Sequence, residues 1–181
     1  TDRVPCVVLL QGLGISDRNA TVGPNQIFKD LAYGLADQGI ATYRFDKRRP
    51  SGVNGEFTPT NLFINDAVNA LDAIQNHQLI RSDAVYLGGH SLGGIWAPQI
   101  AVQHSELAGM LLFDAVSFSF IDQIINSGSS SLDNEYLLEK EKKDIQKQIT
   151  KAKKVKEEGL DSVSQLLGFP DTWIEAHLEY D

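Results

Sequence analysis

The fold of this chain is constrained most by one short stretch, Gly89-His90-Ser91-Leu92-Gly93. It fits the pattern G-x-S-x-G, in which a serine occupies a strained turn between a strand and a helix. The glycines are needed because a side chain beside the serine would press against the neighbouring backbone as the chain reverses. The pattern predicts a strand before Ser91, a helix after it, and a serine hydroxyl raised above the edge of a sheet.

The residues on either side of this turn agree with that prediction. Ala84 to Leu87 form an apolar run that is typical of a buried strand. After the serine, apolar residues recur at helical spacing, namely Leu92, Ile95, Trp96, Ile100 and Ala101. Pro98 interrupts this pattern, so we expect the helix to be bent or to begin late. A glycine-rich loop whose serine only caps the helix is the alternative, but the flanking strand and helix favour a nucleophilic Ser91.

Three more apolar runs predict strands, and helical patterns lie between them. The expected strands cover Val4 to Leu10, Ile40 to Phe45 and Leu107 to Phe113, and the expected helices cover residues 26–38 and the stretch from Leu62 to Ile74. Four strands that alternate with helices predict an α/β fold whose mostly parallel sheet is flanked by helices. Ser16 to Asn25 and residues 50–60 are expected to be loops, and His77 is expected to cap the preceding helix.

From residue 118 onward the sequence becomes polar and rich in Lys and Glu. We expect Ser127 to Ser131 to be a flexible joint, followed by a helix with a narrow apolar stripe that includes Ile145, Ile149, Ala152 and Val155. Breaks are expected at Gly159, Gly168 and Pro170, and a final helix should carry Trp173, Ile174, Leu178 and Tyr180. The lysines alternate with acids and lack aromatic neighbours, so a nucleic-acid interface is not expected.

Several of these segments together resemble the α/β-hydrolases, specifically bacterial esterase-like members with a helical cap between the sixth and seventh strands. The likeness covers residues 4–118 and is carried by the turn around Ser91, Val7 to Gly12 with the loop Ser16 to Asn19, Gly23 to Asn25, Leu31 to Ala36, and Tyr43 to Arg48. It implies a partial α/β-hydrolase fold over residues 1–118, with the nucleophile elbow, and a helical lid insertion over residues 119–181.

The resemblance also implies roles for particular residues. Ser91 would be the nucleophile, and the backbone N–H groups of Leu13 and Leu92 would form the oxyanion hole. Gln11 stands where the family usually has a histidine, which is tolerable because the oxyanion donor is main-chain. Asp114 closes the last strand, where some members carry the catalytic acid, although a structural role is the alternative. Asp46, Lys47 and Arg48 would form a structural loop.

A histidine able to take the proton from Ser91 is hard to find in this sequence. Only His104 and His177 follow Ser91; His104 ends a helix that leads away from the serine, and His177 lies in a helical stretch. A complete α/β-hydrolase has about eight strands, whereas four are expected here. We therefore expect an incomplete domain whose acid and histidine belong to missing C-terminal sequence, and whose open sheet edges could pair with another copy.

Composition narrows the classes of partner. The chain of 181 residues has 16 Lys and Arg against 24 Asp and Glu, a net charge of -8, which argues against binding nucleic acid through bulk electrostatics. Its one cysteine, Cys6, allows no internal disulfide, and no metal cluster, cofactor site, secretory signal or membrane span is visible. A small-molecule acyl ester is the expected partner. Because the chain starts at Thr1, its compartment stays open, with the cytoplasm favoured over export.

These observations leave several functions open. The first is a serine hydrolase that cleaves carboxylic esters through an acyl-enzyme on Ser91. A peptidase or a thioesterase of the same fold shares this chemistry, so the turn cannot distinguish them. A non-catalytic binding domain is favoured by the lack of a base and disfavoured by the intact turn, and a fragment that serves only as an interaction module would self-associate.

Overall fold

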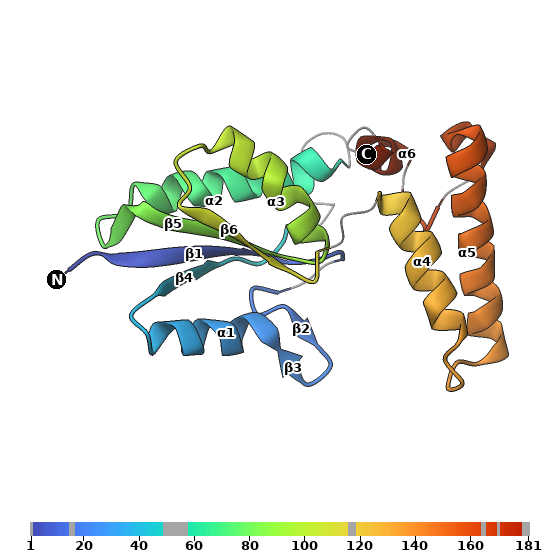
Figure 1. Ribbon diagram of the computed structural model, residues 1–181, viewed down its shortest axis with the longest axis horizontal. Coiled ribbons are helices and arrows are strands. Elements are labelled where there is room, and N and C mark those ends of the chain that lie inside the picture. Colours follow the sequence, from blue (N-terminus) through green and yellow to red (C-terminus); the bar gives the residue numbers. More distant parts are fainter. Residues whose placement is uncertain are drawn as a thin grey trace. The chain divides into compact units, whose positions relative to one another are not determined.

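The structure is a computed structural model that describes residues 2–14, 17–48, 58–115, 119–163, 166–169 and 171–178 (Figure 1). The chain forms two compact units: the first comprises Thr1–Gly55 and Thr60–Val116, and the second comprises Glu56–Pro59 and Ser117–Asp181. Among the described residues, no helix is both long and apolar enough to cross a membrane. Most of the loop expected over residues 50–60 lies outside the described residues, as do Pro170 and Tyr180.

The first unit is built on a parallel sheet. Its strands are β1 (Val4–Leu10), β4 (Ala41–Arg44), β5 (Ile80–His90) and β6 (Gly109–Phe113), in the spatial order β4-β1-β5-β6. Every adjacent pair in this sheet is parallel, so the predicted α/β class and the four predicted strands are confirmed. Parallel neighbours require crossovers, and the helices between the strands supply them.

Helices cover both faces of this sheet (Figure 1). Helix α1 (Ile27–Ala36) lies on one face, and α2 (Asn65–Gln75) and α3 (Leu92–Gln103) lie on the other. Successive side chains of a strand point to opposite faces, so β1 serves two cores. Val7 and Leu9 pack in one cluster with Phe28 of the first helix. The whole run from Cys6 to Leu10 is buried, because both faces are covered.

Some boundaries in this unit differ from the sequence-based expectation. Strand β5 begins at Ile80 rather than Ala84, and its polar residues Arg81 and Asp83 form an exposed ion pair at 2.9 Å. Two short antiparallel strands, β2 (Thr21–Val22) and β3 (Asn25–Gln26), occur where the sequence predicts a polar loop and, at Gln26, the start of a helix. The early start of β5 and the two short strands have one cause: these residues are largely polar, and a strand is predicted from a run or an alternation of apolar residues.

Helix α3 begins directly after the turn, so of the two expectations for this helix, a bend or a late start, the late start is wrong. The backbone N–H groups of Gly94 and Ile95 donate to the Ser91 carbonyl at 2.9 and 3.1 Å, which fixes the first turn of the helix there. The helix then runs through Pro98, which lies on its exposed side.

The described part of the second unit consists mainly of helices. They are α4 (Phe120–Leu132), α5 (Glu139–Glu158), the short 3₁₀ segment η3 (Leu160–Ser162) and α6 (Asp171–Leu178). Helices α4 and α5 pack side by side (Figure 1), and Lys156 Nζ lies 2.6 Å from the Asp122 carboxylate across them. Ile149, Ala152 and Val155 are buried, which agrees with the apolar stripe expected for α5.

The flexible joint expected at Ser127 to Ser131 is wrong, because these residues continue α4. The hydroxyls of Ser129 and Ser131 donate to backbone carbonyls one turn earlier, at 2.7 and 2.8 Å. A Cβ at Gly128 would lie 2.8 Å from the Ile149 side chain, so the glycine permits close approach of α5. Small residues here serve helix packing rather than flexibility.

Candidate active site

Ser91 occupies the turn between β5 and α3, at the carboxyl end of the sheet. Its backbone has φ 54° and ψ −120°, in the left-handed region that non-glycine residues rarely adopt. Such a conformation costs on the order of 1–3 kcal/mol and persists only where the surroundings enforce it. The Ser91 N–H donates to the carbonyl of Phe113 in the neighbouring strand at 2.9 Å, which anchors the turn.

The glycines around Ser91 let backbone pack directly on backbone. A Cβ at Gly89 would lie 2.4 Å from the Gly93 carbonyl oxygen, and a Cβ at Gly93 would lie 2.6 Å from the Leu10 oxygen. A Cβ at Gly94 would meet the Ala115 side chain at 2.6 Å. These close approaches hold β5, α3 and the end of β1 in one arrangement. They are the physical reason for the spacing that the sequence pattern requires.

The loop after β1 lies against the serine. A Cβ at Gly12 would be 3.0 Å from the Ser91 Cβ, so the two residues are in direct contact. Gln11 before it is buried, and its side-chain amide donates to the carbonyls of Asp17 at 3.3 Å and of Phe45. Gln11 therefore joins the loops after β1 and β4, while Leu13, the residue after Gly12, is 44% exposed.

Leu92 is the first residue of α3 and is buried. The first N–H groups of a helix lack partners within the helix and carry the positive end of its dipole. An anion at Ser91 would face this helix end. The roles of Leu13 and Leu92 as oxyanion donors remain predictions.

Lys47 lies beside the loop after β1, which the sequence reasoning did not foresee. Its ammonium donates to the carbonyl oxygens of Gly12 and, at 3.1 Å, Gly14, and it lies 3.9 Å from the centre of the Phe63 ring. Burial lowers the pKa of Lys47 to about 7. The sequence offered a hint, since Lys47 comes two residues after the expected strand Ile40 to Phe45 and so lies near the carboxyl end of that strand.

The charged neighbours of Lys47 are engaged elsewhere. Asp46 pairs with Arg18 at 2.6 Å, and Arg48 pairs with Asp66 at 2.8 Å. The predicted structural role of this cluster fits those two pairs. It does not describe Lys47, whose contacts are with the loop that touches Ser91.

Asp114 follows β6 directly and has φ 51°. It is exposed, and it is the next residue after Phe113, whose carbonyl accepts from Ser91. The structure thus brings Asp114 to the same sheet edge as the serine. Its role as the catalytic acid remains a prediction.

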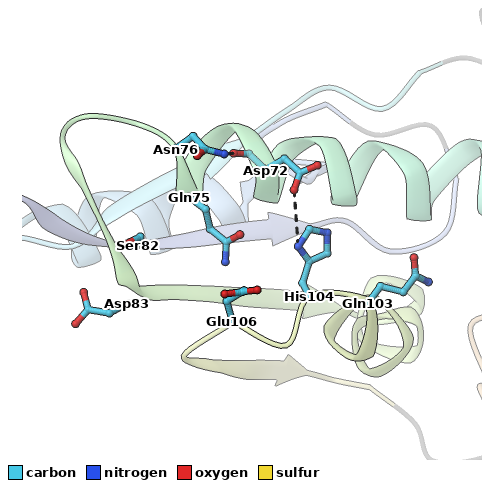
Figure 2. A pocket seen from close by; sticks show the side chains of 8 residues that line it. All are labelled: Asp72, Gln75, Asn76, Ser82, Asp83, Gln103, His104 and Glu106. Carbon is cyan, nitrogen blue, oxygen red and sulfur yellow. Dashed lines mark hydrogen bonds and ion pairs between the residues drawn. The ribbon is translucent and has the colours of Figure 1, made fainter.

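His104 lies at the opposite end of the first unit. It ends α3, whose twelve residues separate it from Ser91 by about 18 Å along the helix. Figure 2 shows it in a surface hollow beside Asp72, with its Nδ1 3.9 Å from that carboxylate and with Gln75 and Glu106 nearby. Ligands of parallel α/β sheets bind at the carboxyl ends of the strands, so this hollow is not the candidate site.

The other histidines have structural surroundings. His77 lies just after α2, where its ring accepts from the Leu79 N–H at 3.3 Å. His90 precedes the serine, and its ring meets Phe28 edge-on at 6.4 Å. His177 is buried in α6, its Nδ1 lies 2.7 Å from the Trp173 carbonyl oxygen, and burial lowers its pKa to about 4.

Other chemistries find no support in the described residues. They contain no cluster of three or more His, Cys, Asp or Glu side chains that could hold a metal ion. Burial raises the pKa of the Cys6 thiol to about 11, so this cysteine is not an activated nucleophile. Ser91 is the one described side chain that combines a strained turn, a helix N-terminus and a carboxyl-end position.

The chain is similar to several known proteins. The family model described as serine aminopeptidase, S33, matches residues 25–122, more than half of the chain. Esterase EstD of Thermotoga maritima is 38% identical over 113 residues, which are 60% of this chain and 26% of that protein. The chain therefore spans about a quarter of the length of this curated relative.

Solved structures show the same fold. The α/β hydrolase GrgF from Penicillium sp. sh18 is 18% identical with a TM-score of 0.51, over 73% of this chain and 43% of that one. A bacterial heroin esterase is 19% identical with a TM-score of 0.52, over 68% of this chain and 39% of that one.

Proposed function

The chain belongs to the serine aminopeptidase S33 family and has the α/β-hydrolase fold, and we propose that it cleaves carboxylic esters through an acyl-enzyme on Ser91. The observation that carries this proposal is the strained backbone of Ser91, whose φ is 54°, in the turn between β5 and α3. Gly12 packs against the Ser91 side chain. The similarity to a protein named as an esterase, at 38% identity, favours esters over other acyl substrates.

In the proposed reaction, the Ser91 hydroxyl oxygen attacks the acyl carbon and its proton passes to a histidine base. The carbonyl oxygen gains negative charge, which the N–H groups of Leu13 and Leu92 stabilise. The tetrahedral intermediate then collapses, the C–O bond to the alcohol breaks, and the alcohol takes the proton from the histidine. In the second half of the reaction, the histidine takes a proton from water and the water oxygen attacks the acyl carbon. The Ser91 oxygen then leaves the acyl carbon and takes the proton from the histidine.

The proposal assigns the histidine base to sequence outside residues 1–181, with Asp114 or a residue of that same outside segment as the acid. Support comes from the first unit, where His104 lies about 18 Å from Ser91 along α3. His177 is an unsuitable base in this state, because burial lowers its pKa to about 4, which makes the ring a weak proton acceptor, and because the side chain is enclosed.

The second unit is proposed to serve as the lid over the acyl pocket. It is a separate compact unit made of helices, and α4 and α5 are joined by the Asp122–Lys156 ion pair. In this role it would select the acyl or alcohol group, while the chemistry stays with the first unit.

The test supplies the missing base from solution. Hydrolysis of p-nitrophenyl acetate is measured with added imidazole for the wild-type chain, Ser91→Ala and Ser105→Ala; Ser105 is an exposed serine after α3 and serves as the control. We expect imidazole to accelerate turnover by wild type and Ser105→Ala above the rate with Ser91→Ala. With imidazole present, a fluorophosphonate should add one phosphonyl group, located on Ser91 by mass spectrometry of peptides.

Equal rates for all three proteins, together with no phosphonylated Ser91, would show that the chain is a non-catalytic binding domain. Because imidazole supplies a base, the lack of a suitable histidine among residues 1–181 does not by itself explain such a result.

A peptidase is the second candidate, favoured by the family model itself, which is described as a serine aminopeptidase. Amide and ester cleavage share the acyl-enzyme, and they differ in the leaving group that must be protonated. Comparing an amino-acyl p-nitroanilide with p-nitrophenyl acetate separates them: Ser91-dependent release of nitroaniline at a comparable rate would favour the peptidase.

A further inference from the structure

The geometry points to Lys47 as a positioning residue that orients and polarises the oxyanion-binding N–H of Leu13 through the Gly12–Leu13 peptide. This inference rests on the proposed function of Ser91 and extends it to a residue outside the predicted site. The Lys47 ammonium donates to the carbonyl oxygens at both ends of the loop segment that contains Leu13, namely those of Gly12 and Gly14.

Lys47 would act on the Gly12–Leu13 peptide first through the geometry of that group. The carbonyl of Gly12 and the N–H of Leu13 belong to the same planar trans peptide and point in opposite directions. An ammonium bound to the Gly12 oxygen therefore fixes the direction of the Leu13 N–H, away from Lys47. Because Gly12 touches the Ser91 Cβ, this peptide lies beside the position of the reacting acyl group.

The second step is electronic. A cation on a carbonyl oxygen draws electron density from the peptide, which makes the N–H at the other end a stronger donor. This effect is larger in a partly buried site than in water. Lys47 would thus strengthen the Leu13 donor at the moment when the oxyanion forms, without touching the substrate.

The third step is the cost of placing an ammonium there. Burial disfavours the charged form of Lys47, and the flanking Asp46 and Arg48 pair with Arg18 and Asp66 rather than with it. Its described contacts are the loop carbonyls and the face of the Phe63 ring. An apolar side chain could fill this place without the desolvation cost of an ammonium, so a purely structural role does not require a lysine.

The first experiment reads the peptide directly and needs no turnover. The full chain is labelled with ¹³C-carbonyl glycine and ¹⁵N-leucine, so that triple-resonance NMR detects Gly–Leu peptides only. The sequence has three, at residues 12–13, 34–35 and 159–160. The Leu13 signal is identified by its loss in Leu13→Val, and the Leu35 and Leu160 signals are internal controls.

We expect the wild-type Leu13 signal to shift with pH, with a midpoint near 7, as Lys47 loses its proton. The shift should vanish in Lys47→Met, which has no charge, and in Lys47→Arg, which keeps its charge at every pH tested. Leu35 and Leu160 should not move in any variant. The inference would be overturned if the Leu13 chemical shift in the wild type did not change with pH and was the same in Lys47→Met.

The second experiment measures catalysis with the imidazole-supported assay. Lys47→Met should lower kcat by about 10- to 100-fold, less than removing an oxyanion donor outright, with little change in KM. Lys47→Arg should recover most of kcat, and thermal unfolding checks that both variants are folded. Ser91-dependent turnover with an unchanged kcat in Lys47→Met would contradict the inference.

The two experiments separate the two proposals. If wild type and Ser91→Ala are equally inactive, the proposed function fails, while the NMR titration still decides whether Lys47 controls the Leu13 peptide. If a folded Lys47→Met changes KM and kcat alike and Lys47→Arg recovers neither, Lys47 is a structural clamp and not a positioning residue.

Discussion

Replacing Gly89 by alanine tests whether close backbone packing enforces the strained turn. The new Cβ would lie 2.4 Å from the Gly93 oxygen, about 1 Å short of the ordinary contact distance of 3.4 Å, and 2.7 Å from the Gly94 Cα. Both neighbours are backbone atoms that cannot rotate away. Overpacking of this kind typically costs about 1–3 kcal/mol, and with fixed backbone neighbours we expect about 3 kcal/mol or more.

The matched control is Gly34→Ala on α1, where a Cβ meets nothing within 4 Å. Gly34 is an exposed helical residue, so alanine should raise the free energy of unfolding by about 0.5–1 kcal/mol. The two identical changes are thus expected to have opposite signs, and the difference between them isolates the crowding at the turn.

The assay is urea unfolding followed by the fluorescence of Trp96, which is buried in α3 directly behind the turn. A Trp173→Phe background removes the other tryptophan, which belongs to the second unit. A total stability of about 5–15 kcal/mol leaves room to measure the expected loss. A loss below about 1 kcal/mol for Gly89→Ala would refute the reasoning, since the backbone would then have moved aside without cost.

Three further predictions concern single contacts. Gln11→Leu leaves the Phe45 carbonyl without its buried donor, so unfolding in urea should show a loss of about 1–3 kcal/mol, whereas the exposed Gln38→Leu should change little. His177 has its pKa lowered from 6.5 to about 4, so the unfolded chain binds the proton first and stability should fall as pH drops from 6.5 to about 4. His177→Phe should remove that pH dependence when thermal unfolding is compared across this range. Lys47 has its pKa lowered from 10.5 to about 7, so the wild-type stability should rise relative to Lys47→Met as pH increases from about 7 to 10.5. A stability difference between these two proteins that does not change across that range would contradict the lowered pKa of Lys47.

Much of the first unit could be predicted because its signals are local. The strand Val4–Leu10 is a continuous apolar run, and the structure gives it the same bounds as the prediction. The turn at Ser91 could be located because its steric demand falls on residues within two positions of the serine. Where a structural requirement and the residues that meet it are adjacent in sequence, the sequence is sufficient.

The sequence-based prediction was wrong where the same residue types, glycine and serine, occur both in loops and in packed helices. Ser127 to Ser131 reads as a flexible joint because glycine and serine are common in loops, yet the serines bond to carbonyls of their own helix. Gly128 has its partner in Ile149, on another helix. Such pairings between distant residues are invisible to a single sequence without homologues.

By itself, the sequence determined the alternation of strands and helices, the parallel class of the sheet and the position of Ser91 at a strand-to-helix turn. Only the tertiary structure decided that Gln11 joins the loops after β1 and β4, and that Lys47 holds the carbonyls of Gly12 and Gly14. The physical reason is that periodicity and turn chemistry act over a few neighbouring residues. The direction of a long polar side chain depends instead on which distant backbone the fold brings within its reach.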